Sequence, residues 1–386
     1  MQQFTEFAIM LCIHYKQDSL MAVSFYNFND LHHDEIITTI KDRINSIIDN
    51  SAFVEGEFNQ AFEKEFAANQ KAKHCLLVAN GTDALEIALK VYGVGPGDKV
   101  GVPGITFYAT AEAVLNVGAT PVWIDVDPIA GLFCPKSLER VHAKHNLKAV
   151  MPVHIYGLPC PMKEINSFCQ TNNIAIVEDA AQAQGTYYGE NSPVGDSPNL
   201  VTFSFYPTKN LSAFGDAGCI LTNDDDLAKK ILAERNHGRG DDMVMGRNSR
   251  CDHMQAAVLH AKLPEAQKFN NQRKMVAQRY FNALQGLPIK VLPEHFICLS
   301  SWHLYPVQVE SVEVREKLMA YLRSKEIGCT PFYEKTLSQE ASLVEFEGED
   351  ESARGFAGHT LCLPMNPFLT EEDVLEVSGA IKEFFN

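Results

Sequence analysis

The chain has 386 residues, of which 46% are hydrophobic and 21% charged, and its formal net charge at pH 7 is -16. That length is sufficient for one large hydrophobic core and a smaller second domain. A strong acidic excess repels nucleic acid and anionic membrane surfaces, so we expect neither as a partner. An anionic ligand must then be held by helix N-termini and by single Arg or Lys side chains.

The ten cysteines are scattered without a C-x-x-C pair, and several lie inside apolar runs. Such cysteines are typical of core residues in a reducing compartment, so we expect a cytoplasmic protein without a metal site. The apolar run at 8–13 is too short to span a bilayer, and no basic leader precedes it. We interpret residues 1–25 as an N-terminal extension and favour Met21 as the native start.

From residue 75 to residue 224, apolar strand-like runs alternate with segments of helical period. The expected strands are 75–80, 99–104, 120–127, 148–157, 174–181, 200–207 and 217–224. The expected helices are 83–92, 109–117, 135–144 and 162–171, with 183–198 as a further candidate. Continuous Val/Ile runs between short helices predict an α/β fold, with a mostly parallel seven-stranded sheet covered on both faces. The chain between the last two strands is too short for a helical crossover, so they should pair antiparallel or leave the sheet.

The character of the chain changes after residue 225. The pattern there predicts a helix ending at Gly238, a polar loop at 239–250, and a long helix that bends or breaks at Pro264. A smaller α+β unit should follow from about residue 290, with strands at 302–310 and 329–333 and a last helix capped by Thr370 and Asp373. We expect a large domain at 26–260, with a front helix at 34–49, and a small C-terminal domain at 261–386.

Two motifs that follow predicted strands could seat a phosphorylated aromatic ligand, because open α/β sheets bind ligands at the carboxyl ends of their strands. In NGTDAL, 80–85, Gly81 permits close backbone approach, Thr82 adds a hydroxyl, and the amides of Thr82 and Asp83 are expected to be free donors for phosphate. An ordinary capped turn is an equally good interpretation. In PGITFYAT, 103–110, the Phe107 ring could stack on a planar cofactor, although a core phenylalanine is the commoner case.

Two further motifs supply an acid and an amine. In VEDAAQAQG, 177–185, Asp179 could accept a hydrogen bond from a protonated ring nitrogen and Gln182 could bond a phenolic oxygen. In FSFYPTKNLSAFGDAGC, 203–219, Ser204 could contact phosphate, and Lys209 brings an amine to a strand end, where a lone lysine would otherwise be solvated. A phosphate seat, a stacking ring, a carboxylate and a lysine are together what pyridoxal 5′-phosphate needs.

These stretches resemble the DegT-type nucleotide-sugar aminotransferases, which are fold type I enzymes dependent on pyridoxal phosphate. The resemblance covers about residues 27–385 in the family's order, through NGTDAL, TFYAT, EDAAQ, PTKN and GRNSR. It implies that Lys209 carries the cofactor aldehyde and that Asp179 binds the ring nitrogen. The cofactor contacts it implies are Gly81, Thr82, Asp83, Phe107, Asp179, Gln182, Ser204, Lys209 and Asn248. Because Asn248 would reach the partner subunit's cofactor, the resemblance also implies a homodimer with shared active sites.

The resemblance further implies transfer of an amino group from L-glutamate to a nucleotide-linked keto sugar, which we expect to be a dTDP-keto-6-deoxyhexose. The product would serve polysaccharide or metabolite glycosylation. The loop at 239–250, otherwise a solvated segment, would supply counter-charges for the diphosphate. The candidate substrate residues are Tyr206, Arg247, Arg250, His303 and Tyr333, of which His303 also fits a core histidine. Phe332 and Ser338 replace family histidines and Ala217 replaces a glycine, so the sugar's identity does not carry over.

Two other functions stay open. One is amination of a non-nucleotide cyclic ketone, of the inosose or aminoshikimate type. The other is a non-catalytic regulator that binds the cofactor or a sugar nucleotide. Against the regulator stands the intact set of Lys209, Asp179 and Gln182, and Lys209 also separates the chain from sugar dehydratases of this fold, which carry histidine at that position.

Overall fold

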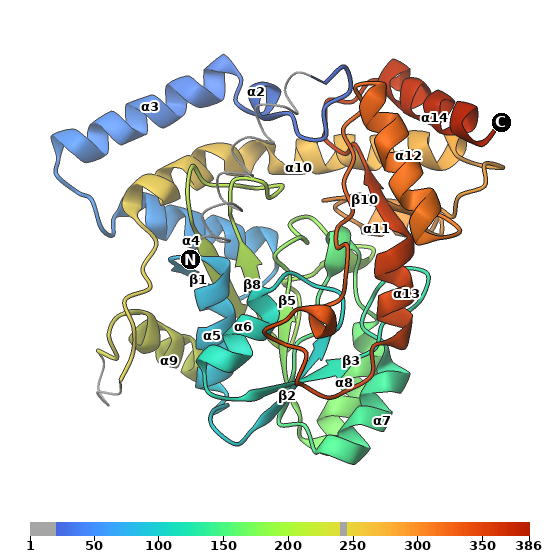
Figure 1. Cartoon of the computed structure of the whole chain (residues 1–386). Helices are drawn as coiled ribbons and strands as arrows, with labels where there is room; N and C mark the ends of the chain where they lie inside the picture. Colours follow the sequence, from blue (N-terminus) through green and yellow to red (C-terminus); the bar gives the residue numbers. More distant parts are fainter. Residues whose placement is uncertain (1–20, 240–244) are drawn as a thin grey trace.

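A seven-stranded sheet organises the large domain of this computed structural model, which describes residues 21–239 and 245–386 (Figure 1). The strands are β1 (His74–Val78), β2 (Lys99–Pro103), β3 (Thr120–Ile124), β4 (Ala149–Val150), β5 (Ala175–Asp179), β8 (Leu200–Ser204) and β9 (Gly218–Thr222). Their spatial order is β1-β9-β8-β5-β4-β2-β3. Only β9 of these runs against its neighbours, β1 and β8. The mostly parallel sheet and the antiparallel last pair are therefore confirmed. The predicted extension falls largely outside the described residues.

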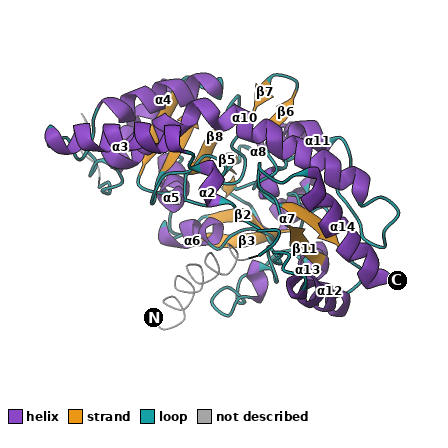
Figure 2. Cartoon of the chain, turned by 90° about the horizontal axis from the view of Figure 1, so that it is seen from above, coloured by secondary structure: helices purple, strands orange, loops and turns teal. Residues whose placement is uncertain are grey.

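Helices cover both faces of the sheet because its strands are apolar on both sides. On one face, α5 (Gly81–Val91) and α6 (Ala109–Asn116) pack against side chains such as Val102, Val177 and Ile220. The opposite face is covered by α4 (Glu57–Asn69), α7 (Pro135–His145), α8 (Met162–Asn172) and the start of α10 (His253–Ala283). Figure 2 shows β8 between α4 on one side and α5 on the other. The predicted fold class is confirmed.

The helix α10 is continuous through Pro264, so the predicted break is wrong. Proline removes one backbone donor from a helix, but Leu263 and Phe269 are buried on either side of it and hold the helix in place. Helix α3 (Asp34–Asp49), at its predicted position, lies along α10, with Ile36 and Ile40 against Val258 (Figure 1). Helix α9 (Asp225–Arg235) precedes the loop. Because α10 crosses residue 260, the division of the chain at that point stays a prediction.

The C-terminal region is a smaller α+β unit. It contains α11 (Phe296–Leu299), β10 (Tyr305–Gln308), α12 (Val312–Ser324), η2 (Leu337–Gln339), α13 (Glu351–His359), β11 (Thr360–Leu363) and α14 (Glu371–Phe385). The predicted strand at 329–333 is reduced to one bridge, in which Thr330 pairs with Cys362 on the edge of β11 (a strand that was not predicted) opposite to β10. The Thr370–Asp373 capping box of α14 is confirmed. The candidate helix at 183–198 is instead a hairpin of β6 (Tyr187–Gly189) and β7 (Ser192–Pro193).

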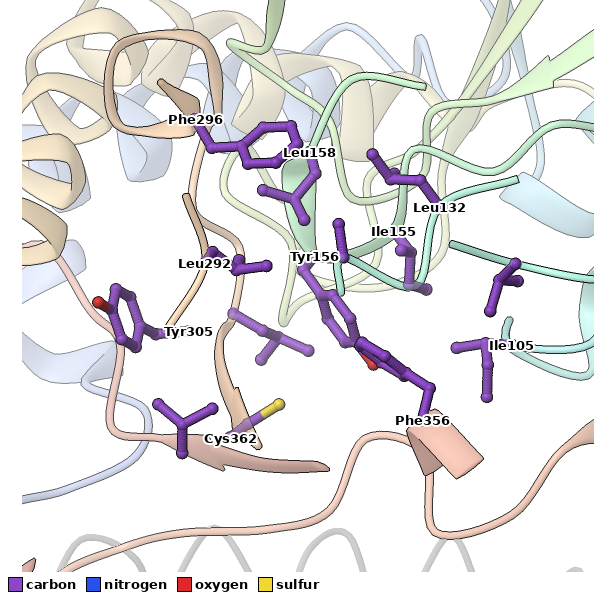
Figure 3. Packing of buried hydrophobic residues seen from close by; sticks show 14 of the residues in the cluster. Ile105, Leu132, Ile155, Tyr156, Leu158, Leu292, Phe296, Tyr305, Phe356 and Cys362 are labelled. Carbon is purple, nitrogen blue, oxygen red and sulfur yellow. The ribbon is translucent and has the colours of Figure 1, made fainter. Parts of the chain in front are cut away.

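A shared apolar cluster joins the sheet to the small C-terminal unit (Figure 3). Tyr156, from η1 (Ile155–Gly157), stacks on Phe356 of α13 with ring centroids 6.2 Å and ring planes 27° apart. The segment after Tyr333 then returns to the sheet edge, where Trp123 Nε1 donates to the Phe346 carbonyl at 2.9 Å and the Glu349 amide donates to the Trp123 carbonyl at 2.9 Å. These contacts fix the segment that carries Tyr333 against the large domain.

Among the residues described, none of the helices combines the length and the apolar character needed to cross a bilayer. In the same part of the chain, no His, Cys, Asp or Glu cluster is arranged to hold a metal ion, and the nine described cysteines are free thiols.

Candidate active site

Most predicted site residues gather at the carboxyl ends of β1, β5 and β8. Asp179 is the last residue of β5, which pairs in parallel with β8. Lys209 follows the end of β8 by five residues, and residues 81–83 form the first turn of α5, shortly after the end of β1. Because β1, β5 and β8 all point their carboxyl ends to one edge of the sheet, the sequence places an acid, an amine and a helix N-terminus on the same side.

The Asp179 carboxylate is buried and held in a single orientation. Thr110 Oγ1 donates to its Oδ2 at 2.9 Å, and the Ala181 amide donates to its Oδ1 at 3.1 Å. Burial raises the pKa of Asp179, while these two hydrogen bonds and the nearby charge of Lys209 act in the opposite direction. The result is a fixed acceptor that can receive a further N–H donor.

The Lys209 amine is close enough to Asp179 for each charge to shift the other's pKa. Burial lowers the pKa of Lys209 to about 8, and the Asp179 carboxylate opposes part of this effect. The turn is closed by the Lys209 amide, which donates to the Tyr206 carbonyl at 2.8 Å, and by the Ala213 amide, which donates to the Phe205 carbonyl at 2.8 Å. A lysine with this pKa is partly neutral near physiological pH, as a nucleophilic amine must be.

The connection from β1 into α5 is tightly packed against β8 and β9. A Cβ on Gly81 would lie 2.7 Å from Ser204 Cβ, and a Cβ on Gly218 would lie 2.6 Å from the Asn80 carbonyl. The backbone at Gly81 therefore lies directly beside Ser204, as a shared phosphate seat requires. One expectation needs correction: the Asp83 amide is not a free donor, because Asn80 caps the helix and its Oδ1 accepts that N–H at 2.8 Å.

Gln182 and Phe107 lie close to Tyr333, which is itself near Asp179. Gln182 is buried, with its Oε1 accepting from the Tyr156 amide at 2.6 Å and its Nε2 donating to the Tyr333 hydroxyl at 3.3 Å. The Phe107 ring lies 6.5 Å from the Tyr333 ring and is 51% exposed, so it is not the core phenylalanine of the alternative interpretation. Burial raises the pKa of Tyr333, and the Asp179 charge adds to this effect, so the phenol stays protonated.

His303 is a buried side chain that is also near the amine. Its Nδ1 lies 3.2 Å from Asn210 Oδ1, and its backbone amide donates to the Tyr156 carbonyl at 3.0 Å. Burial, together with the charges of Lys209 and Arg273, lowers the pKa of His303 well below its usual value. The imidazole is therefore neutral. His303 is close to Lys209, as a substrate residue would be, and it is also buried and hydrogen-bonded, as a core histidine would be.

The remaining predicted residues are either exposed or paired with other side chains. Arg247 is paired with Glu86, with Asp83 at 3.3 Å and with Glu234 at 3.9 Å, so carboxylates already surround its charge. Arg250 donates to Asn236 Oδ1 at 2.8 Å. Asn248 is exposed, as is Tyr206. Within residues 21–239 and 245–386, no hydrogen bond or ion pair joins Asn248, Arg247 or Arg250 to Lys209 or Asp179.

The sequence interpretation missed a buried network beneath Asp179. The fully buried Glu178 carboxylate accepts hydrogen bonds from His154 Nε2 at 3.0 Å, from Asn199 Nδ2 at 2.8 Å, and from the hydroxyls of Ser197 and Tyr188. Burial opposes ionisation of Glu178, but the hydrogen bonds outweigh it and hold the pKa of the carboxyl below its usual range.

The tautomer of His154 follows from its second ring nitrogen. The Cys160 amide donates to His154 Nδ1 at 3.0 Å, so the proton lies on Nε2 and points at Glu178. The His154 backbone amide in turn donates to the Asp179 carbonyl at 3.0 Å, which ties the network to the site. The signal available in the sequence was the pair of adjacent acids in VEDAAQ beside the histidine of PVHIYG on the neighbouring strand.

Comparison with known proteins places this arrangement in a family. The model of the DegT/DnrJ/EryC1/StrS aminotransferase family matches residues 34–382. A UDP-N-acetyl-3-dehydro-α-D-glucosamine 3-aminotransferase from Acidithiobacillus ferrooxidans is 36% identical, over 90% of this chain and 93% of its own length. A pleiotropic regulatory protein from Geobacillus stearothermophilus is also 36% identical, over 89% of this chain and 93% of its own length. The crystal structure of S. venezuelae DesV in complex with a ketimine intermediate superposes with a TM-score of 0.86 and 33% identity, over 94% of this chain and 98% of that one.

Proposed function

The chain belongs to the DegT/DnrJ/EryC1/StrS aminotransferase family, and we propose that its pocket binds pyridoxal 5′-phosphate and transfers an amino group from L-glutamate to a nucleotide-linked keto sugar. The observation that carries this proposal is the pairing of a lysine of lowered pKa with a fixed, buried carboxylate at neighbouring strand ends. The family is an aminotransferase family and the Acidithiobacillus ferrooxidans relative is named as an aminotransferase, so this chain is an aminotransferase as well.

The pocket residues fit this cofactor. Asp179 offers a fixed acceptor for a ring N–H, and the exposed Phe107 ring offers a stacking face. The backbone at Gly81 together with Ser204 offers a phosphate seat, and a Cβ at position 81 would collide with Ser204. When bound, pyridoxal phosphate supplies an aldehyde that takes up amines and a ring that withdraws electrons from the reacting carbon. The chain itself supplies Lys209 Nζ, which attaches the aldehyde.

The same lysine can also move a proton during amino transfer. With a pKa of about 8, Lys209 Nζ can accept the proton that leaves the α carbon of the amino donor and can later return it. Asp179 keeps the proton on the ring nitrogen through its own negative charge. Gln182 and Tyr333 hold the opposite side of the pocket through their 3.3 Å contact, with Tyr333 as a neutral donor.

The acceptor is the least specified part of the proposal. The Acidithiobacillus ferrooxidans relative is named for a UDP-linked keto sugar, whereas the motifs led us to expect a dTDP-keto-6-deoxyhexose. We therefore propose a nucleotide-linked keto hexose and keep both nucleotides as candidates. The cytoplasmic location also stays a prediction.

We further propose that the enzyme is a homodimer with shared active sites. Several large apolar side chains are about half exposed, which is typical of protein interfaces. They are Ile48, Phe53 and Val54. Asn248 is exposed and has no hydrogen bond to Lys209 or Asp179 among the described residues, which fits a role toward the partner's pocket. Mixing inactive Lys209→Ala and Asn248→Ala proteins should restore activity if each mixed dimer contains one complete site.

The test of the proposed function has two stages. Purified protein loaded with pyridoxal phosphate should convert the cofactor to its aminated form when L-glutamate is added, as seen by the change in cofactor absorbance. Mass spectrometry and NMR should then identify an amino sugar after incubation with dTDP-, UDP- or GDP-linked keto sugars. Conversion of a free keto-cyclitol alone would instead support the cyclic-ketone alternative. Failure of the glutamate step with cofactor bound would support a regulator, the function named for the Geobacillus stearothermophilus relative.

A further inference from the structure

Lys262, in α10, is a buried cation with no carboxylate partner in the described part of the chain. The side chain is 4% exposed, and its amine lies 2.7 Å from Ser212 Oγ and 3.4 Å from His32 Nε2. The amine also lies 5.7 Å from the centroid of the Phe214 ring. Most buried lysines are paired with an acid, so the surroundings of this amine, a hydroxyl, an imidazole and an aromatic ring, need an explanation.

The electrostatics of these groups favour an anion. Burial lowers the pKa of Lys262 to about 7. Burial and the charge of Lys262 together lower the pKa of His32 to about 4. Each of the two basic groups is therefore disfavoured in its charged form by its surroundings, and an anionic oxygen in contact with both would stabilise their protonated forms. Serine adds a hydroxyl donor of the kind that commonly completes a phosphate site.

The location of this group is next to the proposed cofactor pocket. Ser212 follows Lys209 by three residues in the same loop, so their Cα atoms are separated by at most about 10 Å. Phe214 lies two residues further along that loop. A ligand on Lys262 and Ser212 could therefore extend from the pocket without crossing another domain.

An aromatic surface lies beside the amine. The Phe214 ring is 44% exposed, and the His32 ring meets it edge-on with centroids 4.9 Å apart. Both rings are partly exposed and both lie close to the Lys262 amine. An exposed phenylalanine next to a cationic group is a combination that suits a base and its phosphates, because nucleobases stack on aromatic rings.

Two of the three arginines expected to neutralise the diphosphate are engaged elsewhere, whereas Arg239 is exposed. Arg247 is surrounded by Glu86, Asp83 and Glu234, and Arg250 donates to Asn236. Using Arg247 for a ligand would break ion pairs that already satisfy it. Binding a ligand to Lys262 would break no ion pair. Because the chain has a net charge of -16, an amine with no acid beside it is a favourable contact for an anionic substrate.

We propose that Lys262, Ser212 and His32 bind the phosphates of a nucleoside diphosphate and that Phe214 stacks on its base. This inference rests on the proposed function, because it locates the nucleotide half of the sugar substrate. Lys262, Ser212 and His32 thereby take the role of neutralising the diphosphate, which the sequence interpretation had given to the arginines of the loop at 239–250.

The test is direct binding of dTDP, UDP and inorganic pyrophosphate to the cofactor-loaded enzyme by isothermal titration calorimetry. Lys262→Met should weaken all three ligands by about tenfold or more, the usual effect of removing a hydrogen bond to a charged group. Phe214→Leu should weaken dTDP and UDP but not pyrophosphate. The matched control is Lys268→Met on the same helix, whose exposed amine pairs with Glu265 at 2.9 Å and whose loss should change no affinity. Circular dichroism verifies folding, and Lys262→Gln, which can still hydrogen-bond Ser212, replaces a Met variant that does not fold.

Two results overturn the inference. One is unchanged dTDP and UDP affinity in a folded Lys262 variant. The other is the absence of binding of all three ligands to the wild-type enzyme at millimolar concentration. The glutamate reaction is measured on the same preparations, since it needs no nucleotide. If that reaction proceeds while the Lys262 substitutions leave binding unchanged, this inference fails and the proposed amino transfer stands. If the glutamate reaction fails while binding depends on Lys262, the proposed function fails and the nucleotide site stands.

Discussion

Replacing Glu178 by glutamine tests the buried network beneath Asp179. The substitution keeps the shape of the side chain but removes its charge and turns one acceptor oxygen into an NH₂ donor. Oε1 of Glu178 accepts from Ser197 and from Asn199, and Oε2 accepts from His154 and from Tyr188. The amide oxygen of a glutamine can still accept from Ser197 and Asn199. Its NH₂ group, however, would then face His154 Nε2 and the Tyr188 hydroxyl, which are both donors.

The expected loss of stability follows from those two contacts. Hydrogen bonds to a charged group are worth about 1.5–3 kcal/mol each. Losing two of them in a fully buried site should lower the free energy of unfolding by about 3–6 kcal/mol. Proteins of this kind are typically stable by about 5–15 kcal/mol, so the effect is large enough to measure by urea denaturation.

The effect should also depend on pH with a definite sign. The pKa of Glu178 is lowered in the folded protein from its usual 4.5, so the folded state gains stability from the ionised form. This contribution is fully present above pH 4.5 and is lost as the pH falls through the folded-state pKa. The stability difference between wild type and Glu178→Gln should therefore be constant at neutral pH and narrow only in acid.

A control separates this effect from the general loss of a negative charge. Glu383→Gln breaks the exposed pair with Lys325 and should change stability by less than about 1 kcal/mol. If Glu178→Gln were no more destabilising than Glu383→Gln at neutral pH, the network would not have the strength argued from its contacts.

Three further outcomes are expected. Asp179→Asn should lower the rate of amino transfer by about 10²–10⁴-fold, the usual range for a group that controls a proton, and retention of full activity in a kinetic assay would contradict its role. The rate at which the cofactor attaches to the apoprotein, followed by absorbance, should rise about tenfold per pH unit and level off above about pH 8, because only the neutral Lys209 amine reacts. A rate independent of pH would contradict the lowered pKa of Lys209. Gly218→Val should weaken cofactor binding in an equilibrium titration, because its Cβ would lie 2.6 Å from the Asn80 carbonyl, whereas the same change at exposed Gly379, where nothing lies within 4 Å of a Cβ, should leave binding intact.

Local patterns were enough to predict the sheet and its helices. Continuous apolar runs marked the strands, and helix periodicity with caps such as Thr370 marked the helices. The short connection after residue 207 predicted the antiparallel β8–β9 pair from geometry alone. The failures lie where tertiary packing decides. Pro264 stays inside a helix because buried neighbours support it, and the strand expected at 329–333 forms only a single bridge to β11.

The site could be predicted in part for the same reason. Lys209, Asp179, Gln182 and the turn at Gly81 lie at strand ends, and parallel strands bring their carboxyl ends together whatever the intervening sequence. The partners of an arginine cannot be deduced this way, and Arg247 proved to be surrounded by acids from α5 and α9. Nor did the sequence single out Lys262, since the lack of a partner for a buried amine is visible only in three dimensions.

The most direct test of the account is borohydride reduction of the protein after incubation with pyridoxal phosphate, followed by peptide mass spectrometry. The account predicts a yellow protein and one modified peptide, with the added mass on Lys209, and no modification in protein first treated with an excess of L-glutamate. A colourless protein, or a label on some other lysine while Lys209 stays unmodified, would contradict it.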